Sequence, residues 1–291
     1  ALKKVVQRMR DARRAPMSMA AAPIPLARPR GELQTIVESS YPKTRLSGMA
    51  LAPAIADKLS RVVRQQEARA TLREHGQTPA SHLLLIGPPG TGKTMTSAAL
   101  AAELRMPLFT IKMESVFSRY MGETASKLRL VFDQVASVRG VYLLDEFDAV
   151  GARRGDPNDV GEMRRIVNSV LSFMEEPNST DSVVVAATNH VEILDHALAR
   201  RFDEVIEYSL PTADEGVAIL KTRLGRFKLA TNILKSLRDD LEGLSQGEIV
   251  RAAVSAVREA ILDGHTGIST DHLAAMLRDR KAFRNRFSSV S

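Results

Sequence analysis

The sequence predicts an α/β fold in which a parallel sheet of five strands carries helices on both faces, followed by a small all-α domain. Two observations predict this fold. Between residues 55 and 210, short apolar runs alternate with amphipathic helical patterns, which is typical of a parallel sheet with helices packed on it. After Pro211 the strand patterns stop and only helical patterns remain. We therefore expect a domain boundary near residue 211.

The predicted strands are short runs of apolar residues. They cover residues 83–86, 107–113, 141–144, 182–187 and 205–208. The helices between them carry apolar residues three and four positions apart, as Leu128, Val131, Phe132 and Val135 do, and this spacing places such residues on one helix face. These helices cover residues 55–75, 93–104 and 124–138.

Helical patterns also fill the region after Pro211, with Gly243, Gly264 and Gly267 between them as helix ends. These helices cover residues 212–226, 231–240, 246–263 and 270–281. Four parts are expected along the chain: a basic helix with a Pro-rich linker (1–30), a large α/β domain (31–210), a helical domain (211–281) and a basic tail (282–291), with fraying from about Arg278.

The formal net charge of +7 is concentrated at the N-terminus. The first 30 residues contain eight basic residues and one acidic residue, Asp11, so the rest of the chain is neutral in sum. A neutral folded body disfavours nucleic acid as a partner. The basic segment is expected to be a solvated helix that follows an upstream domain; the alternative is an organelle presequence, which it resembles in its many arginines.

The composition excludes several kinds of site. Cys is absent, which excludes disulfides and Cys-ligated zinc, and the six His are scattered singly, without the spacings of a metal site. No apolar run approaches the roughly 20 residues that a membrane-spanning helix needs. We therefore expect a cytoplasmic protein with no membrane contact.

Residues 87–94, GPPGTGKT, match the phosphate-loop pattern GxxxxGK[ST] between a predicted strand and a predicted helix. The glycines allow backbone N–H groups to face phosphate oxygens, and the helix N-terminus adds partial positive charge. Lys93 would neutralise the β- and γ-phosphates, and the Thr94 hydroxyl would bind Mg²⁺. The expected nucleotide contacts are Gly87, Pro88, Pro89, Gly90, Thr91, Gly92, Lys93, Thr94 and Met95. The sequence thus predicts a site for ATP with Mg²⁺.

Two adjacent acids, Asp145 and Glu146, directly follow the apolar strand 141–144. Ligands of open α/β sheets bind at the carboxyl ends of the strands. Asp145 is therefore expected in the shell of the Mg²⁺ ion, and Glu146 is expected to orient and deprotonate the attacking water.

These two motifs, followed by AATN (186–189) and LARRFD (198–203), resemble the AAA family of AAA+ ATPases, in particular its katanin, spastin and FtsH-like branch and bacterial stand-alone AAA ATPases. The resemblance covers about residues 40–280. It implies a P-loop NTPase (RecA-like) fold with a helical lid domain. It also implies ATP hydrolysis and assembly into a homo-oligomeric ring, a hexamer by family analogy.

Three further catalytic roles follow from the resemblance. Asn189 matches the polar sensor residue that helps to place the attacking water, and Arg200 and Arg201 match the arginine fingers that reach the nucleotide of a neighbouring subunit. Each has an alternative interpretation. Asn189 can be a turn residue at a strand end, and the two arginines can be surface residues at a helix end.

The segment 119–123, between the strand 107–113 and the helix predicted from Thr124, matches the first pore loop of the family, with Tyr120, Met121 and Gly122 in contact with the substrate. A large amphipathic ring beside a flexible Met can pack on many different side chains. The alternative is that Tyr120 covers the edge of the core. The loop 153–158 is either a second pore loop or a solvated loop.

The resemblance also indicates residues around the adenine. Gln246 and Gly247 replace the usual Gly-Ala of the lid segment, and Gly48 lies in a weak match to the upstream flanking loop. Glu248 stands where many other AAA+ groups have a sensor arginine, which argues against the clamp-loader, initiator and Clp-like groups.

The predicted function is an ATP-hydrolysing ring motor that remodels, unfolds or translocates a polypeptide through a central pore. The chain contains no HExxH or zinc-finger string, so a separate peptidase must act if degradation is the outcome. Bacterial stand-alone AAA ATPases that this chain resembles can work beside a subtilisin-like serine protease, so the resemblance makes a separate serine protease or an adaptor a further candidate partner. One alternative is a nucleic-acid motor or loader, which the neutral body disfavours. The other is an ATP-switched assembly scaffold, which the presence of Lys93, Glu146 and Arg201 disfavours.

Overall fold

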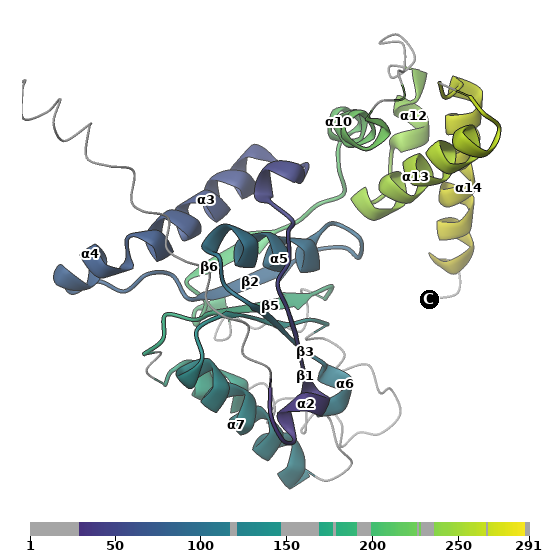
Figure 1. The fold of residues 1–291 in the computed structure, drawn as a ribbon. Coiled ribbons are helices and arrows are strands. Elements are labelled where there is room, and N and C mark those ends of the chain that lie inside the picture. The colour runs from purple at the N-terminus through teal and green to yellow at the C-terminus, as the bar shows by residue number, and fades with distance from the viewer. Residues whose placement is uncertain are drawn as a thin grey trace, which may run out of the picture.

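A computed structural model describes residues 29–116, 121–146, 169–176, 179–190, 199–225, 227, 236–265 and 267–288. It consists of an α/β part built on one sheet and a separate group of helices beside it (Figure 1). Among these residues, no helix is long and apolar enough to cross a membrane.

The sheet has six strands in the order β1-β3-β4-β5-β2-β6. Five of them are parallel, as predicted: β2 (His82–Ile86), β3 (Leu108–Ile111), β4 (Val141–Leu144), β5 (Val183–Thr188) and β6 (Glu204–Glu207). The sixth, β1 (Val37–Ser40), pairs antiparallel with β3 at one edge. The sequence did not predict β1 because its residues are Val-Glu-Ser-Ser, of which only Val37 is buried.

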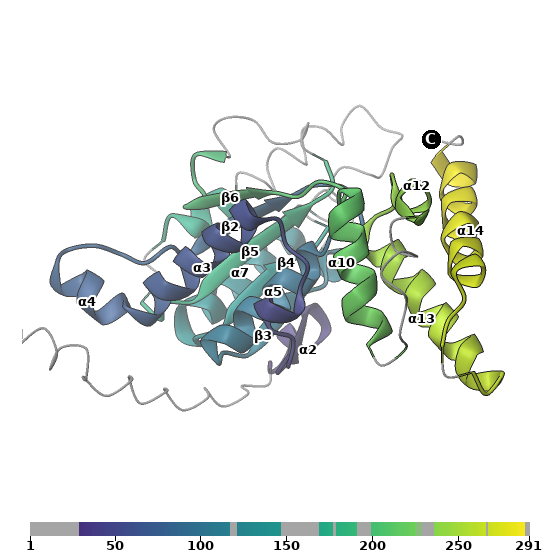
Figure 2. The same ribbon diagram turned by 90° about the horizontal axis from the view of Figure 1, so that it is seen from above.

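Helices cover both faces of the sheet, as expected (Figures 1 and 2). On one face lie α3 (Pro53–Glu67) and α5 (Lys93–Leu104); on the other lies α7 (Met121–Ser137). Alternate residues of β2 contribute to the hydrophobic cores on the two faces of the sheet. Leu83 and Leu85 belong to the core under α3 and α5, and Leu84 belongs to the core under α7. Short elements complete this part: α2 (Leu33–Ile36), the 3₁₀ turn η1 (Leu46–Gly48), α4 (Arg69–Glu74) and α6 (Met113–Val116).

The remaining helices have a core of their own, made of residues such as Leu220, Leu241, Ile249 and Leu273. They are α10 (Ala213–Leu224), α12 (Arg238–Leu241), α13 (Gln246–Leu262) and α14 (Thr270–Ser288). Both α10 and α13 begin with a capping box, in which a Ser or Thr hydroxyl and a Glu carboxylate satisfy backbone N–H groups of the first turn.

Several predicted boundaries were wrong. The helix predicted over 55–75 is two helices, α3 and α4, that meet at Ala68. The chain does not fray from Arg278, because α14 continues to Ser288. The helix predicted from Thr124 begins at Met121, so Met121 and Gly122 lie in the first turn of α7 and not in a loop. Of the helix predicted over 231–240, only α12 is described.

Candidate functional site

The site lies at the carboxyl ends of three neighbouring strands. The strand order places β4, β5 and β2 side by side, and because they are parallel their carboxyl ends meet at one edge. The phosphate loop follows β2, Asp145 and Glu146 follow β4, and Asn189 follows β5. Topology thus brings together three motifs that are far apart in the sequence.

The phosphate loop has a backbone that requires glycine. Gly87, Gly90 and Gly92 have φ values of 146°, 78° and 98°, which L side chains rarely adopt. A Cβ atom at Gly87 would overlap the backbone oxygen of Tyr208, and one at Gly90 would lie 2.7 Å from Ser245 Oγ. The loop is therefore packed closely on both sides and leads directly into α5 at Lys93.

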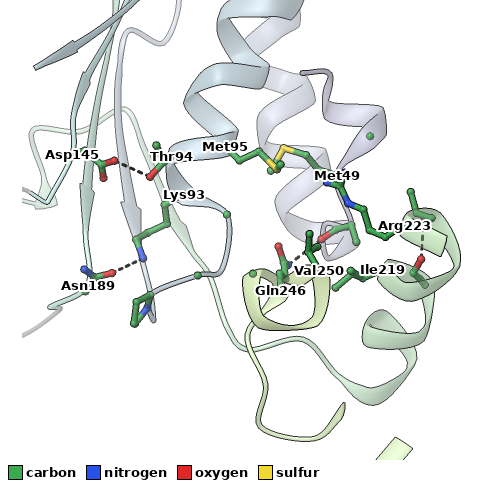
Figure 3. A pocket seen from close by; sticks show the side chains of 18 of the residues that line it. Met49, Lys93, Thr94, Met95, Asp145, Asn189, Ile219, Arg223, Gln246 and Val250 are labelled. Atoms are coloured by element: carbon green, nitrogen blue, oxygen red, sulfur yellow. Dashed lines mark hydrogen bonds between the residues drawn. The ribbon is translucent and has the colours of Figure 1, made fainter. Parts of the chain in front are cut away.

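Lys93 is buried and connects the loop to the sensor position. Its Nζ donates to the carbonyl oxygens of Gly87 (2.6 Å) and Pro88 (2.9 Å) and to Asn189 Oδ1 (2.8 Å). An ammonium group in this position can transfer its hydrogen bonds to phosphate oxygens when a nucleotide binds. Figure 3 shows Lys93, at the start of α5, and Asn189, just after β5, facing each other.

The two residues predicted to hold Mg²⁺ contact each other directly. Thr94 Oγ1 donates to Asp145 Oδ2 at 2.8 Å. A hydroxyl and a carboxylate are the oxygen ligands that Mg²⁺ prefers beside phosphate groups, so the donor set fits the ion. Glu146 follows with a positive φ of 49°, and its N–H donates to Asp145 Oδ1 at 3.1 Å.

A cavity of about 600 Å³ extends from these residues to the helical group. This volume is in the range of small-molecule sites. At its far end lie Met49, Ala50, Ile219 and Val250, which offer apolar surface for a base. The lining is Ser47, Gly48, Met49, Ala50, Pro89, Gly90, Gly92, Lys93, Thr94, Met95, Asp145, Glu146, Asn189, Ala218, Ile219, Thr222, Arg223, Gln246, Gly247 and Val250.

The start of α13 is bonded to both loops that border the cavity. The N–H of Gly247 donates to the Gly90 carbonyl at 2.9 Å, and Gln246 Nε2 donates to the Ala50 carbonyl at 3.0 Å. Gly48, Gln246 and Gly247, which the sequence assigned to the adenine end, all line the cavity.

Tyr208 supports the phosphate loop from below. Its hydroxyl and that of Thr96, in the first turns of α5, lie 2.6 Å apart and share a hydrogen bond. Burial raises the pKa of Tyr208 to about 12, although the bond to Thr96 acts in the opposite direction. The phenol therefore stays neutral at physiological pH, and either hydroxyl can donate this bond.

Neither Arg200 nor Arg201 lines the cavity. Arg201 Nε instead lies 2.9 Å from Glu175 Oε1, and the two side chains are 38% and 59% exposed. The residues predicted to be arginine fingers are therefore on the surface, away from the nucleotide cavity of their own chain.

The predicted substrate loop is described only in part. Tyr120 lies outside the described residues, as does the loop 153–158, and Met121 and Gly122 are described only as helical backbone.

Thr91, in the phosphate loop, is buried, and its hydroxyl donates a hydrogen bond to the Pro88 carbonyl.

Sequence reasoning missed eight residues of the cavity lining. They are Ser47, Met49, Ala50, Ala218, Ile219, Thr222, Arg223 and Val250. Those on α10 recur at helical spacing (Ala218, Ile219, Thr222 and Arg223), which is equally typical of any amphipathic helix. These residues line the cavity because the helical group packs beside the edge of the sheet.

Comparisons with known proteins agree with this geometry. The sequence model of the family described as "ATPase family associated with various cellular activities (AAA)" matches residues 83–210. An uncharacterized AAA family ATPase, y4kL of Sinorhizobium fredii (strain NBRC 101917 / NGR234), is 33% identical over 243 residues, which are 84% of this chain and 73% of the relative.

Proteasome-activating nucleotidase of Saccharolobus solfataricus is also 33% identical, over 226 residues that are 75% of this chain but only 57% of the relative. Among solved structures, the AAA domain of FIGL-1 is similar with a TM-score of 0.66 and 23% identity, over 84% of this chain and 85% of that one. The likeness to FIGL-1 concerns the fold alone.

Proposed function

The chain belongs to the AAA family of ATPases, enzymes that hydrolyse ATP, and on that basis we propose that it is the subunit of a ring that remodels, unfolds or translocates a polypeptide. The name of the Saccharolobus relative describes a nucleotidase that activates a proteasome, which supports a polypeptide as the substrate. We also propose that residues 31–210 and the helical part predicted over 211–281, which α14 extends to Ser288, act as two domains, since each part has its own core.

The observation that carries the proposal is that the sheet edge and the helical group line one and the same cavity. Its lining comes from the phosphate loop, from Asp145 and from α10 and α13. A nucleotide in the cavity would contact both the sheet edge and the helical group. Loss of its γ-phosphate would change its contacts with the sheet edge. The angle between the two parts would then depend on the nucleotide state, as an ATP-driven motor requires.

The side chains at the sheet edge divide the chemistry among them. Lys93 would hold the β- and γ-phosphates, Thr94 and Asp145 would hold Mg²⁺, and Glu146 would accept the proton of the attacking water. Bound Mg²⁺ supplies positive charge that stabilises the transferring phosphoryl group. Asn189 Oδ1 now accepts from Lys93 (2.8 Å); release of this bond would free the amide to orient the water.

Arg200 and Arg201 would complete the site of a neighbouring subunit. Their place on the surface, outside the cavity of their own chain, supports this role. An arginine finger raises phosphoryl-transfer rates by roughly 10³–10⁵-fold in related systems. Assembly and hydrolysis are therefore expected to depend on each other.

The test is steady-state ATPase activity against protein concentration for the wild type and for Arg201→Ala. We expect the specific activity of the wild type to rise with concentration and that of the variant to stay low at every concentration. Arg64→Ala, which removes an exposed arginine on α3, is the matched control and should behave as the wild type does. Activity that is independent of concentration and survives the loss of Arg201 would exclude the ring and favour a monomeric switch.

A further inference from the structure

Three arginines gather around one aspartate at the edge of the sheet opposite the nucleotide cavity. Asp181 precedes β5, Arg139 precedes β4, and Arg69 and Arg73 lie on α4. Because β4 and β5 are parallel neighbours, their starts lie together, at the end away from Asp145 and Asn189. Figures 1 and 2 show α4 at the side of the molecule remote from α13.

Asp181 already binds two of the arginines. Arg73 Nη2 lies 2.5 Å from Asp181 Oδ1, and Arg69 Nε lies 3.6 Å from Asp181 Oδ2. The Asp181 side chain is only 9% exposed, whereas those of Arg69 and Arg73 are 35% and 48% exposed. The aspartate is thus at the bottom of the cluster, and the two guanidinium groups reach outward from it.

Arg139 brings a third positive charge that this aspartate does not neutralise. The side chain is half-buried, and among the described residues nothing accepts a hydrogen bond from its buried Nε–H. Burial lowers the pKa of the Arg139 guanidinium, and the charges of Arg69 and Arg73 lower it further, against the opposite effect of Asp181. A half-buried charge that is not fully neutralised is costly, and a second anion beside the guanidinium group would reduce this cost.

The cluster is held in place by the loop that carries Asp181. Asp181 has a positive φ of 55°, a conformation that a non-glycine residue keeps only when its surroundings enforce it. On either side, Thr180 Oγ1 donates to the Val135 carbonyl (2.7 Å) and Ser182 Oγ donates to the Val138 carbonyl (3.2 Å). Both carbonyls belong to the end of α7 and the turn after it, just before Arg139, so the loop and Arg139 are fixed relative to each other.

We propose that Arg69, Arg73 and Arg139 form a binding site for a second oxyanion, either a carboxylate of an acidic peptide segment or a phosphate group. The fork of N–H donors on a guanidinium group matches both kinds of oxyanion, often with two hydrogen bonds at once. Arg139 adds a guanidinium group for which no ion pair is found among the described residues, and the two more exposed arginines close around the ligand. Since this edge is opposite the nucleotide cavity, the ligand binds without competing with ATP.

The test measures binding of two probes to the full chain saturated with ADP and Mg²⁺, which keeps the probes out of the phosphate loop. The probes are a fluorescent oligoglutamate peptide, followed by anisotropy, and inorganic phosphate, followed by the shift in melting temperature. Arg139→Gln should weaken binding by about tenfold or more, as expected for loss of a charge-assisted pair. Arg251→Gln, which removes an exposed arginine of α13, is the matched control and should bind as the wild type does.

Two further variants keep the test decisive if Arg139→Gln folds poorly. Arg139→Lys retains the charge without the fork and should bind more weakly than the wild type but more tightly than Arg139→Gln. Asp181→Asn removes the internal carboxylate that competes for the same donors, so its affinity for the probe should increase. Tight binding of the peptide would identify an acidic protein segment as the ligand, and a response to phosphate alone would identify a small anion. If neither probe binds, or if binding is equal in the wild type and in Arg139→Gln, the site does not exist.

Discussion

Glu146 has a left-handed backbone conformation, with a φ of 49°, directly after the strand that delivers Asp145. Non-glycine residues with positive φ are uncommon, and they concentrate at functional sites where the surroundings enforce them. Here the N–H of Glu146 donates back to the Asp145 carboxylate at 3.1 Å. The turn of the chain thus separates the two carboxylates: that of Asp145 lies beside Thr94, and that of Glu146 has no partner among the described residues.

This separation of roles predicts the behaviour of Glu146→Gln. The amide cannot take a proton from water, so ATP should bind with unchanged affinity while turnover falls by about 10²–10⁴-fold, the usual contribution of a general base. The measurements are equilibrium binding of ATP and single-turnover hydrolysis. Glu67→Gln, at the exposed end of α3, is the control and should hydrolyse ATP normally. Normal turnover in Glu146→Gln would assign the base to another residue.

Asp203 ties the segment after Arg200 and Arg201 to the start of β2. Its Oδ2 accepts hydrogen bonds from the backbone N–H groups of Ser81 (2.8 Å) and His82 (2.9 Å). Burial alone would raise the pKa of Asp203, but the bonds from His82 and Ser81 outweigh it and lower the pKa to about 2. A carboxyl with a depressed pKa stabilises the fold above its unfolded pKa of about 3.9 and loses that contribution as the pH falls.

Asp203→Asn should therefore lower the free energy of unfolding at neutral pH. The difference in the free energy of unfolding between wild type and variant should become smaller as the pH falls from about 4 toward 2, because the wild-type carboxyl then takes up a proton. Urea unfolding of both proteins across this range measures the effect. A gap that stays constant with pH would show that the charge of Asp203 is not the stabilising feature.

Among the secondary-structure elements, those that carry strong local patterns could be predicted from the sequence. The five parallel strands are apolar runs, and the phosphate loop and acid pair follow two of them directly. Strand β1 was missed because an edge strand with one buried residue has no such pattern. Met49, Ile219 and Val250 could not be assigned to the cavity, since their meeting depends on how segments far apart in the sequence pack together.

At the scale of the whole molecule, the proposed pore predicts that a mutation can abolish work on the substrate without abolishing ATP hydrolysis. Tyr120 lies outside the described residues, so its role rests on the family motif. Tyr120→Ala should leave basal ATPase activity largely intact and abolish ATP-dependent unfolding of a protein substrate, because a small side chain cannot grip a polypeptide. Tyr120→Phe keeps the ring and should retain unfolding. Unchanged unfolding by Tyr120→Ala would exclude this residue as the pore contact.

The hydrogen bond between Gly247 and Gly90 joins the first turn of α13 to the loop that would hold the phosphates. Since a Cβ atom at Gly90 would lie 2.7 Å from Ser245 Oγ, there is little space between them to absorb a displacement. Any force that a resisting substrate exerts on the helical part must then reach the phosphate loop. By thermodynamic reciprocity, a nucleotide that favours one angle between the parts is itself bound more tightly at that angle. Mechanical load would therefore tune the affinity for nucleotide, and a stalled motor would bind and release ATP differently from one that runs free.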